Sequence, residues 1–376
     1  MHSAAVVGTG LIGTSIALAL TERGVTTHLI DRDPDRLRIA AARGAGIPGL
    51  PSAPADIAVI AVPPSHTARA LADHQKAELA RTYTDVASVK ELVHAQCLAL
   101  GCDTTSLVGG HPLAGRERSG PLAARADLFE DHPWVLTPTP ETGELALNRA
   151  LELVSLCNAV PVLLEPPEHD RAVALASHLP RLMASLTAAR LLEGTDHAVR
   201  LAGRGMRDVS RAAAGEPDLW ADILAANAAA VGPLLAELGA DLQTAAAALA
   251  RLAGDDPRPQ GEALAELTRL LRRGAEGRSR VAAPHGGPSA QPTAVLSVAV
   301  GEDRDRELAR LLGDVDAARL ELEDVVLPDG ADAPAPPGGT VVLLVAPDAA
   351  DPLAEVLRSR GWSVRRRPSA HPTESR

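Results

Sequence analysis

Three closely spaced glycines near the start of the chain constrain its fold more than any other feature. Gly8, Gly10 and Gly13 follow the short apolar run 4–8 and precede residues 11–23, whose apolar side chains recur with helical spacing. This order predicts a strand, a tight turn and a helix. The first glycine permits the turn, the second lets the backbone approach a bound group, and the third lets helix and strand pack closely. Because phosphates bind well at the amino end of a helix, the pattern predicts a dinucleotide site.

An acidic residue at the end of the second predicted strand indicates which dinucleotide to expect. Asp31 closes the segment 26–31. Its carboxylate is placed to accept hydrogen bonds from the adenosine ribose hydroxyls and would repel a 2′-phosphate, so we expect NAD rather than NADP. The adjacent Arg32 weakens this preference, because a guanidinium could pair with that phosphate. The predicted cofactor contacts are Gly8, Gly10, Leu11, Ile12, Gly13, Asp31, Arg32, Val62 and Pro63.

Strand-like and helix-like patterns alternate over the first 166 residues. Further strand candidates lie at 56–62, 81–88 and 132–138. The first of these is almost continuously apolar, as in a strand of a parallel sheet that is buried on both faces. We therefore expect residues 1–166 to form an NAD-binding α/β domain of the Rossmann type, with a doubly wound sheet.

The pattern changes after Pro166 and Pro167. Residues 167–281 contain no strand-like segment and are rich in Ala and Leu at helical spacing, which predicts an all-α domain for substrate binding and dimerisation. Pro180 lies inside the first of these helices, so we expect a kink or a break near Ser177.

The last part of the chain predicts a third, smaller domain. A Pro- and Gly-rich stretch at 282–292 is typical of a linker. Residues 293–367 then follow the order strand, helix, strand, strand, helix, strand. This βαββαβ order predicts a small α+β domain of ferredoxin-like topology. Residues 368–376 resemble a frayed tail.

Composition excludes several other classes of protein. With 46% hydrophobic and 23% charged residues, the 376-residue chain can bury cores in two or three domains. A net charge of −11 disfavours nucleic-acid binding, which depends on phosphate neutralisation. No apolar run reaches the roughly 20 residues of a membrane span, so we expect no membrane partner. Cys97, Cys102 and Cys157 form neither a disulfide framework nor a metal-binding pair, and we expect a cytoplasmic protein without a metal.

Five segments carry a more specific signal. They are T-D-V-A-S-V-K (84–90), G-G-H-P-L-A-G-R-E-R-S-G (109–120), L-F-E-D-H-P-W-V-L-T-P (128–138), S-H-L-P (177–180) and R-D-V-S-R-A-A-A-G-E-P-D-L-W-A-D-I-L-A-A-N (207–227). In this order they resemble the prephenate/arogenate dehydrogenase family of tyrosine biosynthesis, and G-G-H-P-x-A-G is the most specific of the motifs. The resemblance implies NAD(P)-dependent oxidation of a cyclohexadienyl 4-hydroxyl, coupled to loss of the ring carboxylate as CO2, in a homodimer formed by the helical domain.

The implied reaction needs a group that takes the 4-hydroxyl proton and a cation that fixes the ring carboxylate. His111 matches the family's histidine that bonds to the hydroxyl, and a neutral imidazole can accept a proton near pH 7. Gly109, Gly110 and Pro112 around it suggest a constrained loop. Ser88 matches the family's serine that shares the hydroxyl contact, although a cap at a strand end is the alternative.

The resemblance also implies a set of substrate-binding residues. Arg211 matches the family's arginine that binds the substrate carboxylate, and a guanidinium fork suits a carboxylate. Asp208, one helical turn earlier, could orient it. Glu117 matches a polar position near the pocket mouth, and Trp220 is equally well explained as an anchor in the core. Lys90, one of two lysines in the chain, is assigned to substrate binding, with a solvated turn as the alternative.

The chain departs from the family's S-H-L-P-H motif at one position, where Arg181 replaces the second histidine. An arginine there could favour the pyruvyl carboxylate of prephenate or alter sensitivity to tyrosine. His178 is better explained as structural. Some family members append an ACT-type regulatory unit, and residues 293–367 fit its topology. We therefore expect an ACT-like domain that senses an aromatic amino acid such as tyrosine, with a domain that only aids assembly as the alternative.

The resemblance thus implies an NAD-dependent oxidoreductase that converts prephenate to 4-hydroxyphenylpyruvate. Arogenate stays open as a substrate, because it differs from prephenate at one side-chain carbon. Two other functions stay open as alternatives. A 3-hydroxyacid or imine-type dehydrogenase has the same architecture but would not require G-G-H-P-x-A-G. A non-catalytic NAD-binding regulator is disfavoured because His111, Ser88 and Arg211 are all intact.

Overall fold

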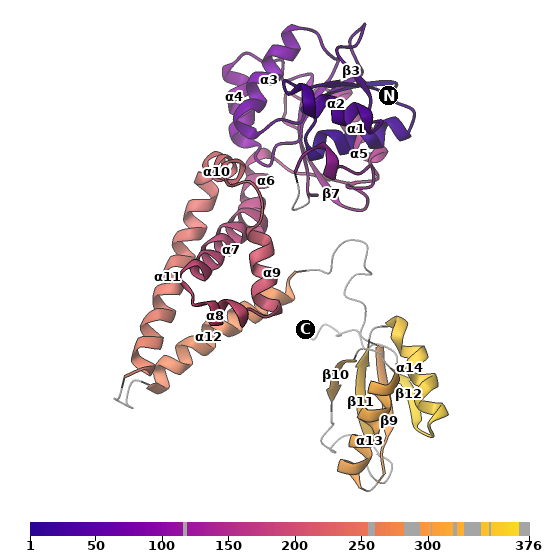
Figure 1. Cartoon of the computed structure of the whole chain (residues 1–376), viewed down its shortest axis with the longest axis vertical. Helices are drawn as coiled ribbons and strands as arrows, with labels where there is room; N and C mark the ends of the chain where they lie inside the picture. Colours follow the sequence, from indigo (N-terminus) through magenta and orange to yellow (C-terminus); the bar gives the residue numbers. More distant parts are fainter. Residues whose placement is uncertain are drawn as a thin grey trace. The chain divides into compact units, whose positions relative to one another are not determined.

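The computed structural model describes residues 1–115, 119–254, 260–281, 294–301, 303–318, 322–326, 340–345 and 347–367. The chain divides into two compact units, Met1–Gly274 and Ala275–Arg376 (Figure 1). The first unit contains an α/β part followed by a helical part. The predicted linker 282–292 and the predicted tail 368–376 lie outside the described residues.

An eight-stranded sheet forms the centre of the α/β part. Its spatial order is β3-β2-β1-β4-β5-β6-β7-β8, and neighbouring strands are parallel except for the antiparallel pair β6 and β7. The order runs outward from β1 and β4 in opposite directions, which creates the switch point where doubly wound proteins bind ligands. The strands are β1 (Ser3–Val7), β2 (Thr26–Ile30), β3 (Ile47–Pro48), β4 (Ile57–Ile60), β5 (Tyr83–Asp85), β6 (Leu107–Pro112), β7 (Pro133–Thr137) and β8 (Val160–Leu163).

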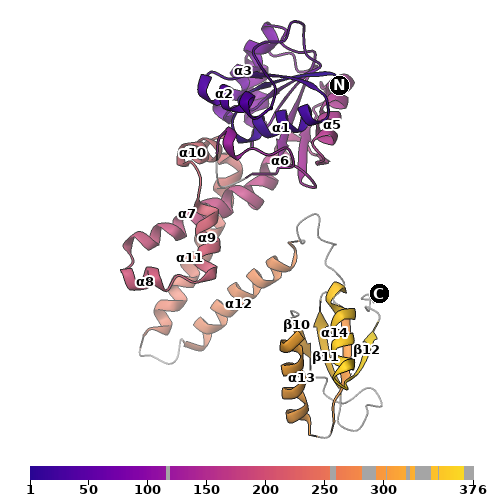
Figure 2. The ribbon, with the colours of Figure 1, turned by 45° about the vertical axis from the view of Figure 1, so that its right-hand side comes forward.

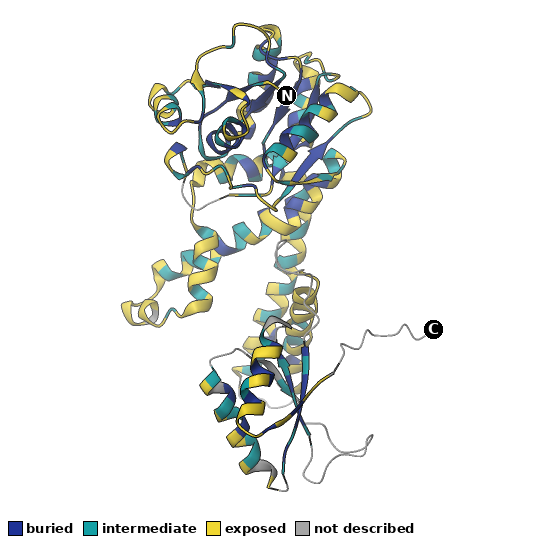
Figure 3. Ribbon diagram, turned by 90° about the vertical axis from the view of Figure 1, so that its right-hand side faces the viewer, coloured by how far each residue is buried: buried dark blue, intermediate teal, exposed yellow. Residues whose placement is uncertain are grey.

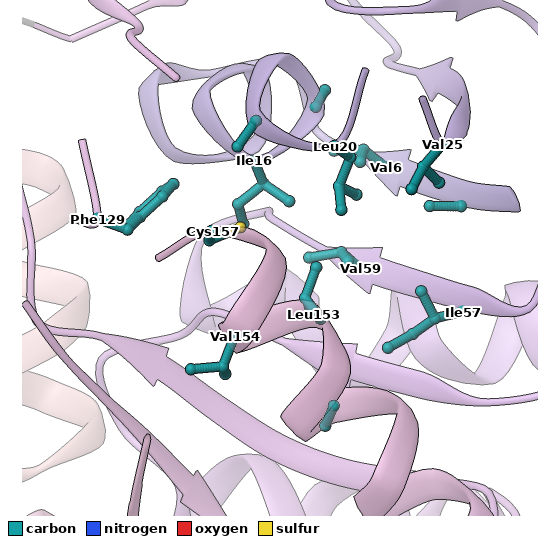
Figure 4. Close-up of a cluster of buried hydrophobic side chains, with 14 of the residues drawn as sticks. Val6, Ile16, Leu20, Val25, Ile57, Val59, Phe129, Leu153, Val154 and Cys157 are labelled. Carbon is teal, nitrogen blue, oxygen red and sulfur yellow. The ribbon is translucent and has the colours of Figure 1, made fainter. Parts of the chain in front are cut away.

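Helices cover the two faces of this sheet with separate apolar clusters. On one face, Ile16 and Leu20 of α1 lie above Val59 and meet Leu153 and Val154 of α5, all fully buried (Figure 4). Burying each such aliphatic side chain stabilises the fold by about 1.5–3 kcal/mol. The other cluster packs beneath α3 and α4. The helices are α1 (Leu11–Glu22), α2 (Pro34–Ala42), α3 (Pro64–Lys76), α4 (Glu91–Ala99) and α5 (Glu144–Leu156), and a 3-10 turn, η1, spans Pro121–Ala123.

The helical part contains no strand among residues 166–254 and 260–281, in agreement with the sequence pattern. The break expected near Ser177 is a π-helical turn, η2 (Ala174–His178), between α6 and α7. Pro180, the second residue of α7, has no N–H to donate to the preceding turn, and the wider π-helical turn lies directly before it. The helices are α6 (Pro166–Val173), α7 (Leu179–Ala189), the 3-10 turn η3 (Arg190–Glu193), α8 (Asp196–Arg200), α9 (Arg204–Ala213), α10 (Pro217–Ala226), α11 (Ala228–Leu252) and α12 (Gln260–Ser279).

The helical part meets the α/β part through α6 and α10. Helix α10 packs on α3, and Asp222 of α10 accepts a hydrogen bond from the backbone N–H of Ser65 at the start of α3 (3.1 Å). Helix α8 lies away from the sheet in both Figure 1 and Figure 2. Exposed stretches are frequent in the helical part, whereas the strands are largely buried (Figure 3). Leu192 and Leu201 are 89% and 84% exposed.

None of the described helices alone is long and apolar enough to cross a bilayer. Helices α10 and α11, which are bent by 96° at their junction, have together the length and the apolar composition of a membrane span.

The second unit has the predicted βαββαβ order. Its four-stranded antiparallel sheet is arranged β10-β11-β9-β12, which is the ferredoxin-like topology. Leu296, Leu311, Leu343 and Leu353 are fully buried between the sheet and its two helices. The elements are β9 (Ala294–Ala299), α13 (Arg304–Ala318), β10 (Leu322–Val326), β11 (Thr340–Val345), α14 (Pro347–Ser359) and β12 (Ser363–Arg367).

Candidate active site

The turn after β1 makes close approaches that only glycine permits. Gly8 has a φ of 100°, and a Cβ atom there would overlap the carbonyl oxygen of Ala61. A Cβ at Gly13 would overlap the carbonyl oxygen of Gly8, because α1 starts directly against β1. At Gly10, by contrast, a Cβ would meet nothing within 4 Å. The turn is thus closed at Gly8 and Gly13 and open at Gly10, which suits the approach of a phosphate to the amino end of α1.

A fixed carboxylate stands beside this turn at the end of β2. Asp31 accepts hydrogen bonds from the backbone N–H of Thr9 (2.6 Å) and from its hydroxyl (2.8 Å), and its other oxygen accepts one from the N–H of Asp33 (2.8 Å). No side chain caps the amino end of α1, whose N-cap residue is Gly10. These groups match the needs of a dinucleotide: free helix N–H groups for the pyrophosphate and a carboxylate for ribose hydroxyls.

The other predicted cofactor positions surround the same turn. Val62 and Pro63 lie between β4 and α3, and Val62 Cγ1 would be 3.3 Å from a Cβ placed at Gly8. Val62 is half-buried, as are Leu11 and Ile12 in the first turn of α1, whereas Pro63 is exposed. Arg32, next to Asp31, is exposed. All of these residues stand near the carboxyl ends of β1, β2 and β4, at the switch point of the sheet.

His111 lies on β6, opposite Val135 of β7, which corrects the expectation of a loop. The glycines before it allow the strand to lie very close to its neighbours. A Cβ at Gly110 would lie 2.6 Å from the carbonyl oxygen of Asp85, and a Cβ at Gly109 would overlap the hydroxyl of Thr137. The G-G-H sequence therefore serves the tight packing of a strand, and this packing fixes the backbone position of His111.

The imidazole of His111 is the first member of a line of three polar side chains. Its Nδ1 lies 2.9 Å from Nε2 of His169, and the two rings are edge to face. Nδ1 of His169 lies 2.7 Å from Oδ1 of Asp170. His169 is fully buried and Asp170 is 3% exposed. Because His169 and Asp170 belong to α6, the line joins the sheet to the helical part.

Asp170 is held from several directions. Its two carboxylate oxygens accept hydrogen bonds from the backbone N–H groups of Lys90 (2.8 Å) and Glu91 (2.9 Å) at the start of α4. Its backbone carbonyl accepts one from the side-chain amide of Asn227 (2.9 Å). The same amide lies 3.0 Å from Nδ1 of His178. Asp170 therefore connects α4, α6 and the junction of α10 and α11.

Lys90 is enclosed rather than exposed. Its side chain is 2% exposed, and Nζ forms an ion pair with Asp85 and donates a hydrogen bond to the carbonyl oxygen of Gly110 (2.6 Å). The alternative of a solvated turn is therefore wrong. The Lys90 ammonium thus forms its contacts with Asp85 and with the backbone next to His111. These contacts favour a positioning role for Lys90 over direct contact with a substrate.

Charge and burial together keep His111 neutral. Burial, reinforced by the charges of His169, Lys90 and His178, holds the pKa of His111 well below its ordinary value. A neutral imidazole has one nitrogen with a free lone pair, which can accept a proton from a hydroxyl group. The site can therefore supply a base near pH 7.

Ser88 belongs to the α/β part of the first unit and Trp220 to its helical part. Ser88 is half-buried between β5 and α4, and its hydroxyl has no hydrogen-bond partner among the described residues. Trp220, on α10, packs against the apolar cluster beneath α3. The guanidinium of Arg181 lies 4.7 Å from the Trp220 ring centre, and His178 meets the ring edge to face. Trp220 thus anchors α10 whatever else it contacts.

Arg211 and Asp208 lie together on α9, which packs on α7. Arg211 Nη2 is 3.4 Å from Oδ1 of Asp208, and the side chains are 65% and 56% exposed. Arg181 reaches the end of the same helix, where it donates a hydrogen bond to the carbonyl oxygen of Ala212. Glu117 lies outside the described residues.

Comparison with known proteins identifies the family. Residues 16–163 match the family model of the prephenate dehydrogenase nucleotide-binding domain, and residues 165–269 match that of the prephenate dehydrogenase dimerization domain. The probable prephenate dehydrogenase NovF of Streptomyces niveus is 43% identical over 366 residues, which cover 96% of this chain and 99% of the relative. The chain belongs to the prephenate dehydrogenase family.

Solved structures agree with this assignment. Synechocystis arogenate dehydrogenase superimposes with a TM-score of 0.59 at 27% identity, covering 74% of this chain and 99% of that one. Prephenate dehydrogenase from A. aeolicus, solved with hydroxyphenyl propionate and NAD+, shares the fold with a TM-score of 0.63 at 23% identity, covering 73% of this chain and 98% of that one.

Several residues of this prephenate dehydrogenase family site were not predicted from sequence. His169 and Asp170 follow two prolines at the start of a helix, where acidic residues commonly serve the helix dipole. Asn227 joins two helices, and Asp85 ends a short strand. Only their burial distinguishes them from ordinary polar residues. The prolines and the chain's change to helical spacing mark the segment, but no sequence pattern indicates that it folds back onto His111.

Acid is expected to destabilise the first unit. Burial lowers the pKa of His178 to about 4 from an ordinary value near 6.5. Between these pH values the unfolded chain binds a proton that the folded chain does not, so stability is complete above pH 6.5 and falls as the pH drops towards 4. The pKa shift of His178 corresponds to a loss of about 3 kcal/mol in the free energy of unfolding at low pH. The pKa of His111 is also lowered, so His111 destabilises the folded state at low pH in the same way. Urea unfolding of wild type and His178→Gln over this range checks it; equal pH dependence in the two proteins would contradict the prediction.

Proposed function

We propose that this chain is an NAD-dependent prephenate dehydrogenase that converts prephenate to 4-hydroxyphenylpyruvate and CO2. The observation that carries the proposal is the half-buried, neutral His111 within the intact G-G-H-P-x-A-G motif of a chain that belongs to this family. Identity of 43% to a probable prephenate dehydrogenase over nearly the whole chain supports the same activity. The A. aeolicus structure with NAD+ supports the cofactor.

The cofactor is assigned to the switch point of the sheet. Gly10 and the uncapped start of α1, with Leu11 and Ile12, would hold the pyrophosphate, and Asp31 would accept the ribose hydroxyls. Gly8 and Gly13 keep the turn close to the sheet. Arg32, Val62 and Pro63 complete the proposed contacts. NAD, when bound, accepts the hydride that leaves C4 of the substrate.

The protein's own chemistry centres on the substrate hydroxyl. In this proposal the free ring nitrogen of His111 accepts the 4-hydroxyl proton, and Ser88 shares the contact with that hydroxyl. Lys90 holds the backbone of Gly110 through Nζ and so positions His111. Oxidation at C4 prepares the ring for aromatisation, which makes loss of the ring carboxylate downhill. No metal is needed for either change.

Arg211 is the proposed partner of a substrate carboxylate. Its planar fork can form two parallel hydrogen bonds with a carboxylate, and Asp208 one turn earlier orients it. Trp220 and Glu117 are further proposed substrate-binding residues. Arg181, half-buried against Trp220, adds a second positive charge in this region. A positive charge there disfavours the ammonium group of arogenate and favours the keto group of prephenate.

The test is NADH formation and CO2 release with prephenate and, separately, arogenate. We expect a higher kcat/KM for prephenate. Arg211→Ala should raise the KM for prephenate by about 100-fold, because charge-assisted bidentate hydrogen bonds are worth about 1.5–3 kcal/mol. Arg204→Ala is the matched control, since Arg204 lies two turns earlier on the same face of α9. If Arg211→Ala and Arg204→Ala have the same KM for prephenate, Arg211 is not the carboxylate partner. A wild-type protein that is inactive on both prephenate and arogenate would refute the proposed function.

The assembly and the second unit carry further proposals. A homodimer formed by the helical part is supported by the match to the dimerization domain and by exposed Leu192 and Leu201. The ferredoxin-like topology of the second unit supports an ACT-like domain that binds tyrosine as an effector. Free cysteines are consistent with a cytoplasmic location. Light scattering tests the dimer, and tyrosine inhibition that survives deletion of residues 284–376 would contradict the effector domain.

A further inference from the structure

The line His111, His169, Asp170 has a direction, because its last member can only accept hydrogen bonds. Asp170 receives two backbone N–H groups from the start of α4 and one ring nitrogen of His169. Burial alone would raise the pKa of Asp170, but these hydrogen bonds outweigh burial and hold it below its ordinary value. The side chain therefore remains a carboxylate, with no proton of its own to donate.

The hydrogen-bond roles along the line follow from that carboxylate. His169 must place its proton on Nδ1, which lies 2.7 Å from Asp170. In the neutral ring, Nε2 of His169 then carries a lone pair and accepts. The partner atom 2.9 Å away, Nδ1 of His111, must be the donor. His111 is thereby left with a proton on Nδ1 and a lone pair on Nε2.

We infer that His169 and Asp170 are positioning residues that select the Nδ1–H tautomer of His111 and so present its unprotonated Nε2 to the substrate. The inference rests on the proposed function for its kinetic consequence. It assigns no contact with the substrate to either residue. Their effect passes through the ring of His111 alone, as the orienting carboxylate of a catalytic triad acts through its histidine.

The arrangement makes the base depend on both parts of the first unit. His111 comes from β6, whereas His169 and Asp170 come from α6, and Asn227 holds the backbone of Asp170 from the start of α11. The other charged or titratable groups around the line are Lys90 and His178. Lys90 is tied to Asp85 and Gly110, and His178 faces the amide of Asn227, so neither offers His111 a competing hydrogen bond.

The direct test is the ring tautomer of His111 in the full-length protein. Nitrogen-15 NMR of histidine-labelled protein at pH 7.5 distinguishes Nδ1–H from Nε2–H rings, and the His111 signals are identified by their loss in His111→Gln. We expect a neutral Nδ1–H ring in wild type. A ring protonated on Nε2, or on both nitrogens, would overturn the inference. This measurement needs no turnover, so it stands even if prephenate proves not to be the substrate.

The kinetic test uses Asp170→Asn. An asparagine amide can donate to His169 and reverse the line, which places the proton of His111 on Nε2. We expect kcat with prephenate to fall by about 100-fold, with KM changed by less than about threefold, because only proton transfer is impaired. The Nδ1–H signature should also be lost. A proportional rise in KM at unchanged kcat would mean that Asp170 acts only on the shape of the pocket.

Two further variants separate positioning from stability. His169→Gln removes the relay ring without changing Asp170, and should reduce kcat in the same way if Asp170→Asn fails to fold. His178→Gln is the matched control, because His178 is an equally buried histidine on the same Asn227 network that does not touch His111. It should leave the His111 tautomer unchanged. Loss of the Nδ1–H signature in His178→Gln would show a general loosening of the helical part and overturn the specific role.

Discussion

Replacing His111 by glutamine is expected to lower kcat with prephenate by about 10³-fold, since a general base typically contributes 10²- to 10⁴-fold to the rate. Glutamine can still donate a hydrogen bond to His169, but its amide cannot take a proton from the 4-hydroxyl. NAD affinity should not change, because His111 stands on β6 and the proposed cofactor contacts lie in α1 and in the turns that follow β1, β2 and β4. Steady-state NADH formation and NAD titration measure the two quantities.

The control for this variant is His132→Gln, which alters an exposed histidine directly before β7. It should retain wild-type kcat. In wild type, kcat/KM should stay flat on the acid side until the pH is below 6.5, because the pKa of His111 lies well below that value. A His111→Gln enzyme with nearly normal kcat would remove this residue from the chemistry.

Gly13→Ala is expected to damage both stability and cofactor binding. Its Cβ would overlap the carbonyl oxygen of Gly8, and a backbone atom cannot move aside as a side chain does. Overpacking of this kind costs about 3 kcal/mol, and the forced shift of α1 away from the turn should weaken NAD binding by about 100-fold. Urea unfolding and NAD titration by calorimetry give the two values.

Two glycine variants isolate the cause. Gly10→Ala places its Cβ in open space, so stability should be nearly that of wild type while NAD binding weakens, because the new methyl group occupies the approach of the phosphates. Gly239→Ala, in the middle of α11 and equally free of contacts, should affect neither binding nor the fold. The prediction fails if Gly13→Ala is as stable as Gly10→Ala.

Features with a local steric cause could be predicted from sequence. The glycine turn, the βαββαβ order of the last domain and the change to helices after Pro166 all follow from patterns within short windows. The break near Ser177 was predicted for the same reason, because a proline disturbs only its own turn and the one before it.

Features that depend on packing could not be predicted. Residues 107–112 form a strand although glycine and proline are depleted in strands. Glycine is required at two of its positions, because Thr137 leaves no room for a side chain at Gly109 and Asp85 leaves none at Gly110. His169 and Asp170 acquire their roles only when α6 folds against β6. Lysine is rare in this sequence, which singles out Lys90, but rarity carries no information about burial, and the Lys90 side chain is enclosed.

The enclosure of Lys90 has a practical consequence for protein chemistry. The chain has only one other lysine, Lys76, which is exposed in the last turn of α3. Of the two lysine side chains, only that of Lys76 is therefore open to an amine-reactive dye applied to the folded protein. A dye on Lys76 would give a fluorescent reporter on the α/β part without any substitution in the sequence.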